Sequence, residues 1–137
     1  MDKKRIINLT QHYATKDQIV AGVIDLPEDL REELIRRLTF DQLPGQGEAQ
    51  QRAACLAGDL TEWLASADIV GIDTVMIGGA PYLMCPLERY LTDEGYTPVY
   101  AYSQRETYEE KQDDGSVRKI AVFRHGGFVQ GAYNQGW

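Results

Sequence analysis

The shorter apolar runs along the chain predict strands. Residues 5–9 (RIINL) contain two β-branched isoleucines and a leucine and end at the polar cluster of residues 10–12, as expected of a strand that leads into a loop. Residues 15–18 (TKDQ) have capping-box spacing and predict a short helical turn, after which residues 20–26 (VAGVIDL) predict a second, weaker strand. Residues 74–77 (TVMI) are apolar on both faces, which is typical of a central parallel strand.

The longer apolar runs have the 3.6-residue period of helices. A first helix is predicted to start at Pro27, a second to cover residues 47–67 and a third residues 81–94, where Pro86 should kink the helix or delay its start. The apolar stripes of the first two helices are expected in the core: Leu30, Leu34, Ile35, Leu38, Ala53, Leu56, Ala57, Leu60, Trp63 and Leu64.

Two further strands are predicted near the C-terminus, at residues 98–103 (PVYAYS) and 117–124 (VRKIAVFR). The segment DDG at 113–115 lies between them and is a hairpin signal. If its last two residues form the turn, paired residues have numbers that sum to 229, which places His125 opposite Gln104.

This order of elements predicts an α/β fold. A β-α-β crossover from residue 74 to 103 favours a Rossmann-like three-layer sandwich with a mostly parallel sheet of about five strands and an antiparallel C-terminal edge hairpin. The length of 137 residues fits one domain, predicted over residues 1–129, with a C-terminal tail at 130–137 that packs outside the core or at a subunit contact.

Composition and charge narrow the range of partners. The chain has no membrane-spanning run and no signal-like start, so we expect a cytoplasmic protein without a membrane partner. A net charge of −7 works against long nucleic acid, although a local pocket can still bind a small anion. Cys55 and Cys85 are expected to be buried thiols, and no metal-ligand spacing or cofactor fingerprint is present, so neither a metal nor a cofactor is predicted.

Three polar segments are predicted to meet beyond the carboxyl ends of the strands, where open parallel sheets bind ligands. They are ligand-binding candidates and belong to three different strand ends: Thr10, Gln11 and His12; Gly78, Gly79 and Ala80; Ser103 and Arg105, with His125 alongside.

Each candidate has a chemical and a purely structural interpretation. Gly78 and Gly79 let backbone N–H groups approach an anion at the start of a helix, or they only permit a tight turn. His12 and His125 could act as general acid or base, or as structural residues. Arg105 could grip two oxygens of an anion, or form an exposed salt bridge with a neighbouring glutamate.

Several motifs also mark a family resemblance: INLTQH, MIGGAP, YSQRETYEE, DGSVRK and VFRHGGF. Over residues 5–129 the chain resembles a family of small uncharacterised proteins of phages, prophages and bacteria. More remotely, Ser103, Arg105, Glu106 and the DG hairpin are similar to those of small Rossmann-like CRISPR-associated accessory proteins. That resemblance implies binding or cleavage of cyclic oligoadenylate signals, but the long helix at 47–67 departs from those shorter proteins.

Three hypotheses follow. The leading one is a homodimer or larger homo-oligomer that binds a small anionic nucleotide-type signal, as a sponge or sensor in phage-host conflict. The second is a metal-independent nuclease of a cyclic nucleotide, with His12 or His125 as acid or base. The third is a non-catalytic protein-interaction module.

Overall fold

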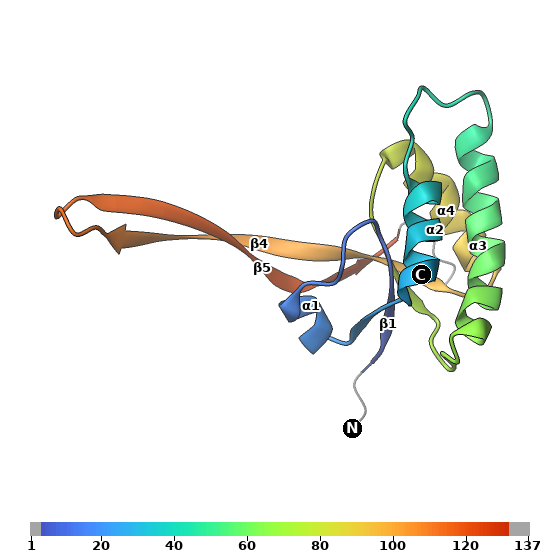
Figure 1. Ribbon diagram of the computed structural model, residues 1–137, viewed down its shortest axis with the longest axis horizontal. Coiled ribbons are helices and arrows are strands. Elements are labelled where there is room, and N and C mark those ends of the chain that lie inside the picture. The colour runs from blue at the N-terminus through green and yellow to red at the C-terminus, as the bar shows by residue number, and fades with distance from the viewer. Residues whose placement is uncertain (1–3, 132–137) are drawn as a thin grey trace.

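The computed structural model describes residues 4–131 and shows a five-stranded mixed sheet with the order β2-β1-β3-β4-β5 (Figure 1). The first four strands in this order are parallel, and β5 is antiparallel to β4. The predicted α/β fold with an antiparallel edge pair is confirmed. The strands are β1 (Ile6–Leu9), β2 (Val23–Asp25), β3 (Thr74–Ile77), β4 (Thr97–Lys111) and β5 (Val117–Gln130).

The helices begin close to the residues that sequence signals mark. Thr15 and Gln18 form both hydrogen bonds of the predicted capping box, and Pro27 is the N-cap of the next helix. The third long helix starts at Pro81, so the alternative of a late start at Pro86 is wrong. The helices are α1 (Lys16–Val20), α2 (Glu28–Leu38), α3 (Glu48–Ser66) and α4 (Pro81–Asp93).

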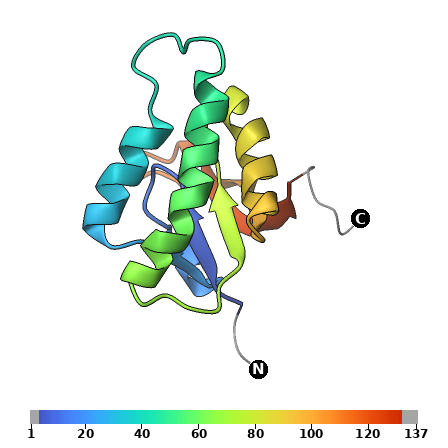
Figure 2. The same cartoon turned by 90° about the vertical axis from the view of Figure 1, so that its right-hand side faces the viewer.

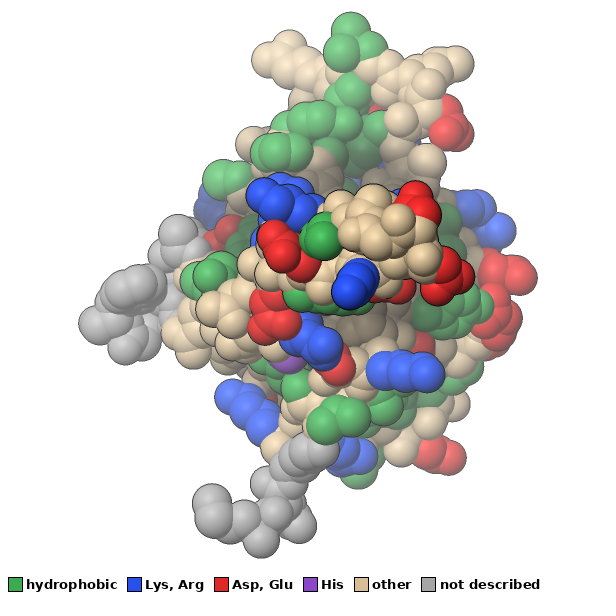
Figure 3. All heavy atoms as spheres, turned by 90° about the vertical axis from the view of Figure 1, so that its left-hand side faces the viewer, with side chains coloured by type: hydrophobic (Ala, Val, Ile, Leu, Met, Phe, Trp, Pro, Cys, Tyr) green, Lys and Arg blue, Asp and Glu red, His purple; other side chains and the backbone are tan. Residues whose placement is uncertain are grey.

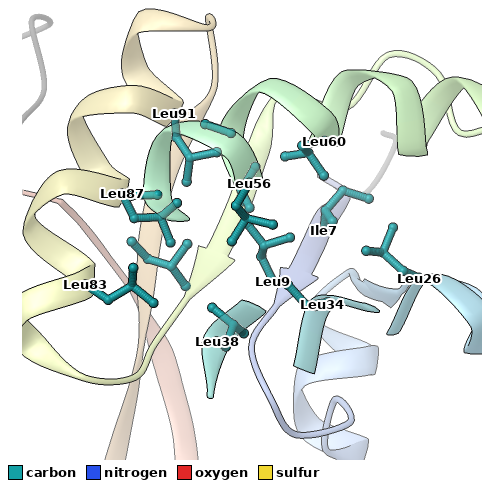
Figure 4. Packing of buried hydrophobic residues seen from close by; sticks show 14 of the residues in the cluster. Ile7, Leu9, Leu26, Leu34, Leu38, Leu56, Leu60, Leu83, Leu87 and Leu91 are labelled. Atoms are coloured by element: carbon teal, nitrogen blue, oxygen red, sulfur yellow. The ribbon is translucent and has the colours of Figure 1, made fainter. Parts of the chain in front are cut away.

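The main core lies between one face of the sheet and the three long helices (Figure 2). Leucines from α2, α3 and α4 converge on Ile7 and Leu9 of β1 (Figure 4). Most of the predicted core residues are buried here, but Leu30 and Trp63 are half-buried at the margin and Ile35 is exposed.

The opposite face of the sheet carries a smaller core. Ile6, Val23, Met76 and Val99 form a buried cluster against which Phe128 of β5 packs. The short helix α1 lies on this side and contacts β2 and β5. The layers are therefore unequal, with three long helices on one face and one short helix on the other.

The β4–β5 pair continues far beyond the rest of the sheet. The pairing of β3 with β4 ends at Tyr100, after which β5 is the only strand beside β4. We call residues 101–127 the arm, because they project from the body of the molecule as a two-stranded ribbon (Figure 1). The predicted strand ends at Ser103 and Arg124 are wrong, since β4 continues to Lys111 and β5 continues to Gln130, while the predicted start of β5 at Val117 is confirmed.

The hairpin turn differs from the predicted two-residue type. The backbone of Gln112 pairs with that of Ser116, and Gly115 has a φ of 86°, which together describe a three-residue loop with glycine in the left-handed region. The extra loop residue shifts the register by one, so His125 lies opposite Ser103 and not Gln104.

A β-bulge interrupts the register at the base of the arm. Tyr102 pairs with Gly127 while Ser103 pairs with His125, so Gly126 is the extra residue on β5. A Cβ at Gly126 would lie 2.9 Å from the ring of Tyr102, which explains why a residue without a side chain stands there.

The expected burial of the two thiols is wrong. Cys55 and Cys85 are both exposed, because each lies on the solvent side of its helix while its leucine neighbours face the core. Within residues 4–131 no helix is long and apolar enough to span a bilayer. Of the predicted tail, residues 132–137 lie outside the described part of the chain, and Gln130 is the last residue of β5.

Candidate functional site

A cavity of about 480 Å³ lies beyond the carboxyl ends of β1 and β3, beside β4. Because these strands are parallel, the segments that follow β1 and β3 emerge at the same edge of the sheet. Five of the sequence-predicted ligand residues line it. The complete lining is Thr10, Gln11, His12, Tyr13, Thr15, Gln18, Met76, Ile77, Gly78, Gly79, Tyr100 and Ala101.

The lining of this cavity is neutral and partly aromatic. None of its residues is acidic, although the chain has a net charge of −7. Met76, Ile77 and the rings of Tyr13 and Tyr100 supply apolar surface, while hydroxyl, amide and imidazole groups supply polar contacts. A planar apolar group with a polar or anionic substituent therefore fits its chemistry.

The loop after β1 is held by a buried asparagine. The Nδ2 of Asn8 donates to the carbonyl of His12 and to the carboxylate of Asp25, both at 2.7 Å, while its Oδ1 accepts from the backbone N–H and hydroxyl of Thr10. Asp25 also accepts from the backbone N–H of Ala14 at 3.1 Å. The loop is thus fixed from beneath by β1 and β2.

A buried arginine supports the same loop. Arg31 of α2 is 1% exposed, donates from Nη2 to the carbonyl of Gln11 at 3.2 Å, and lies 4.3 Å from the ring centre of Tyr13. Its Nη1 is 3.9 Å from Asp25, and neither Nη1 nor Nε has a hydrogen-bond partner in the described structure. Tyr13 donates in turn to Glu28 at 2.6 Å, which raises the pKa of the phenol.

These contacts decide which loop side chains can reach a ligand. The amide of Gln11 donates to Leu38 and Thr39 at the end of α2, and the hydroxyl of Thr10 donates within the loop. Both therefore have a structural role in addition to lining the cavity. The imidazole of His12 is exposed and forms no hydrogen bond or ion pair within residues 4–131, so it is the freest polar group of the loop.

Gly78 and Gly79 form the wall opposite the loop. Gly79 has a φ of 151°, which favours glycine, and a Cβ at Gly78 would lie 3.7 Å from a methyl group of Thr10. The following helix, α4, has no side-chain cap at its N-terminus, where Ala80 is the N-cap. Ala80 itself does not line the cavity, so of the predicted trio only the two glycines do.

Ser103 and His125 lie in an adjoining cavity of about 300 Å³ between α1 and the base of the arm. This cavity shares Thr15 and Gln18 with the first one, and its lining also includes Lys16, Asp17 and Phe123. The His125 ring lies 4.6 Å from that of Phe128, and its buried Nδ1 has no hydrogen-bond partner among the described residues.

Arg105 is placed apart from these groups. It lies opposite Phe123 on the arm, is exposed, and lines neither cavity. The salt bridge considered for it is also not formed within the described residues, because Glu106 pairs with Arg124 at 2.8 Å. The basic residue that lines the adjoining cavity is Lys16.

A larger cavity of about 780 Å³ lies on the other side of Gly79, along α4. Its lining includes Cys85, Arg89 and Glu88, whose carboxylate accepts a 2.6 Å hydrogen bond from Tyr100. Burial and this hydrogen bond raise the pKa of the Tyr100 phenol far above its usual range. This lining thus combines a carboxylate with the guanidinium of Arg89, whereas the neutral cavity has no carboxylate.

Sequence reasoning missed several residues of the site. The capping box located α1, but nothing in the sequence places Thr15 and Gln18 against Gly79 and Tyr100. Asn8 is an ordinary polar residue in an apolar strand, and the only available signal was that a buried polar side chain needs partners. Within residues 4–131, no group of three or more His, Cys, Asp or Glu side chains is placed to hold a metal ion.

Comparison with known proteins identifies a family without an assigned activity. No curated protein and no solved structure matches the chain. The profile of the uncharacterized protein MJ1673 family matches residues 4–129, which include both walls of the neutral cavity and nearly all of the two arm strands. The chain therefore belongs to the uncharacterized protein MJ1673 family.

Proposed function

We propose that the chain binds a small anionic nucleotide-type ligand in the neutral cavity at the carboxyl end of the sheet. The observation that carries this proposal is the lining, in which glycine backbone, a free imidazole and two tyrosine rings meet without any carboxylate. A volume of about 480 Å³ is within the usual range for small-molecule sites.

The base and the phosphate of the ligand contact different residues of the cavity. The base packs against Tyr13 or Tyr100, because a ring offers apolar area and stacking. A phosphate lies at Gly78 and Gly79, near the uncapped start of α4, and the imidazole of His12 donates a hydrogen bond to it.

A longer ligand extends from the neutral cavity into the adjoining cavity. Ser103 and His125 provide polar contacts there. Lys16 takes the charge-neutralising role that the sequence suggested for Arg105, because it lines this cavity, although Asp17 lines it as well. Both cavities share Thr15 and Gln18, which gives a ligand with two phosphates a continuous surface along the start of α1.

Calorimetric titration tests the proposal. The panel contains adenosine monophosphate and diphosphate, cyclic dinucleotides, cyclic oligoadenylates, which the remote resemblance brings in, and inorganic phosphate. We expect heat of binding with at least one nucleotide, lost in Ala101→Trp, which fills the cavity mouth. The matched control is Ala121→Trp on the arm, which should bind normally. The absence of any heat of binding with every member of the panel, or equal binding by both variants, overturns the proposal.

The nuclease hypothesis has weaker support than binding. His12 and His125 line different cavities, so one acid-base pair at one phosphate does not follow from their placement. Chromatography of the bound nucleotide after incubation separates the two functions. Product formation that is lost in both His12→Ala and His125→Ala would favour the nuclease, whereas recovery of intact ligand supports a sensor or sponge.

A further inference from the structure

Beyond its base, where Ala101, Ser103 and His125 line the two cavities, the arm is an exposed surface without contacts to the described body. No residue from 101 to 127 is buried, and Phe123 is 72% exposed, while Tyr102 and Tyr108 are each 49% exposed. Two-stranded ribbons are marginally stable in water without further packing. Each arm strand also has one unpaired edge. Within residues 4–131, no strand lies beside the outer edge of β5 or beside the outer edge of β4 in the arm. Such edges readily pair with another chain.

The charges of the arm are balanced and divided between its strands. It contains five acidic and five basic side chains, so the net charge of −7 belongs to the rest of the chain. On β5 all three charged residues are basic, Arg118, Lys119 and Arg124, whereas β4 carries three glutamates against two basic residues, Arg105 and Lys111. The strand β5 therefore has a charge of +3 and β4 a charge of −1. Figure 3, viewed from the arm tip, shows both signs interspersed with hydrophobic side chains.

We propose that the arm binds the arm of a second copy of this chain, with β5 of one copy beside β4 of the other. A neutral arm does not select a strongly acidic or basic partner, such as nucleic acid. The opposite net charges of its two strands, +3 on β5 and −1 on β4, instead make it complementary to itself in this pairing, whereas β5 beside β5 would bring like charges together.

The arm is also large enough for such an interface. From residue 101 to 111 the β4 strand extends about 33 Å, at about 3.3 Å per residue. Residues 101–127 are comparable in number to the roughly 20–30 residues that each partner contributes to a stable interface. Apolar and aromatic groups at Phe123, Tyr108 and Ile120 supply the packing surface.

Sedimentation velocity over a wide concentration series, without ligand, gives the first test. We expect the full chain to form a dimer. A variant in which an Asn-Gly turn replaces residues 106–122 should be monomeric, and because the arm contributes no buried core residue, its body should keep its fold. A full chain that stays monomeric throughout, or a truncated chain that dimerises as tightly, overturns the proposal.

Charge reversal separates pairing between copies from pairing within one hairpin. Arg118→Glu/Lys119→Glu makes both arm strands acidic, and Glu109→Lys/Glu110→Lys makes both basic. We expect each variant alone to dimerise at least tenfold more weakly, and their mixture to regain dimers. Both variants lose the pairs within the hairpin, so rescue on mixing can come only from contacts between copies.

The matched control for these variants is Asp93→Lys/Glu94→Lys, which reverses two exposed charges on the body. It should dimerise as the unmodified chain does. Dimerisation of either arm variant at full strength, or a mixture that remains monomeric, contradicts the proposed charge matching.

Discussion

The body and the arm share the strands β4 and β5 but use them in opposite ways. In the body, Val99 is buried in the smaller core and Tyr100 donates to Glu88 of α4. Beyond Tyr100, where β3 ends, no residue of the arm is buried. One strand thus changes from core element to exposed surface at a single position. The comparison indicates that the body supplies the stability of the fold, and the exposed arm is the part for which we propose contacts with a second copy.

The largest expected effect is a core truncation in the body. Leu87 of α4 is fully buried, so Leu87→Ala should lower the free energy of unfolding by about 2–5 kcal/mol, through lost burial and a residual cavity. Ile120→Ala on the arm should cost less than about 1 kcal/mol, because Ile120 is only half-buried. Chemical denaturation at low protein concentration measures both. Equal losses would mean that the arm belongs to the same cooperative core.

A somewhat smaller effect is expected where the body supports the cavity. Asn8→Ala should lower the free energy of unfolding by about 1–3 kcal/mol, because Asp25 and Thr10 lose buried partners. It should also speed hydrogen exchange at the Ala14 amide, which Asp25 holds. The control Gln11→Ala removes only the more exposed bonds to α2 and should cost about 1 kcal/mol or less. Unchanged exchange at Ala14 would contradict the proposed support of the loop.

A pH series tests the position where β4 leaves the body. The folded chain holds the Tyr100 proton more tightly than the unfolded chain, since its pKa is raised by burial and by Glu88. This contribution to stability is complete below about pH 10, the usual tyrosine pKa, and is lost as the pH rises towards the folded-state value. Tyr100→Phe should therefore flatten the alkaline fall in stability, whereas Tyr102→Phe on the arm should leave it in place. If stability falls equally steeply with alkaline pH in both variants, the raised pKa of Tyr100 does not cause this fall.

The smallest effect on the body is expected from the arm truncation itself. Replacing residues 106–122 by an Asn-Gly turn should change the free energy of unfolding of the monomeric body by less than about 1 kcal/mol, because no buried side chain is removed. Denaturation monitored by Trp63, which packs against the main core, gives this value. A larger loss would show that the arm stabilises its own body.

The elements of the body could be predicted from the sequence, whereas the length of the arm could not. The helices and central strands could be predicted because packing against one core imposes a regular spacing of apolar residues, as in α3 and β3. The arm could not, because a ribbon with both faces in water needs no alternation of apolar and polar residues, and YSQRETYEEK resembles a loop. The three-residue turn shifted the register for a local reason, the left-handed Gly115.

The candidate site was predicted in outline. Parallel topology alone brings the loop after β1 to Gly78 and Gly79, and the order of elements in the sequence predicts this placement. Arg105 was expected at the sheet edge because β4 was expected to end near it, but the strand continues and carries Arg105 away along the arm. The contacts of Asn8 and Arg31 depend on tertiary packing between β1, β2 and α2, for which the sequence has no local signal.

The bulge at Gly126 sets the phase of β5. Side chains of a strand alternate between faces, yet His125 and Phe128, three positions apart, both face the side of α1, because Gly126 adds one residue between them. Without that residue, Phe128 could keep its place in the smaller core only if every β5 residue from Val117 to His125 turned over to the opposite face. One glycine thus determines which chemistry the whole outer strand shows to each side of the molecule.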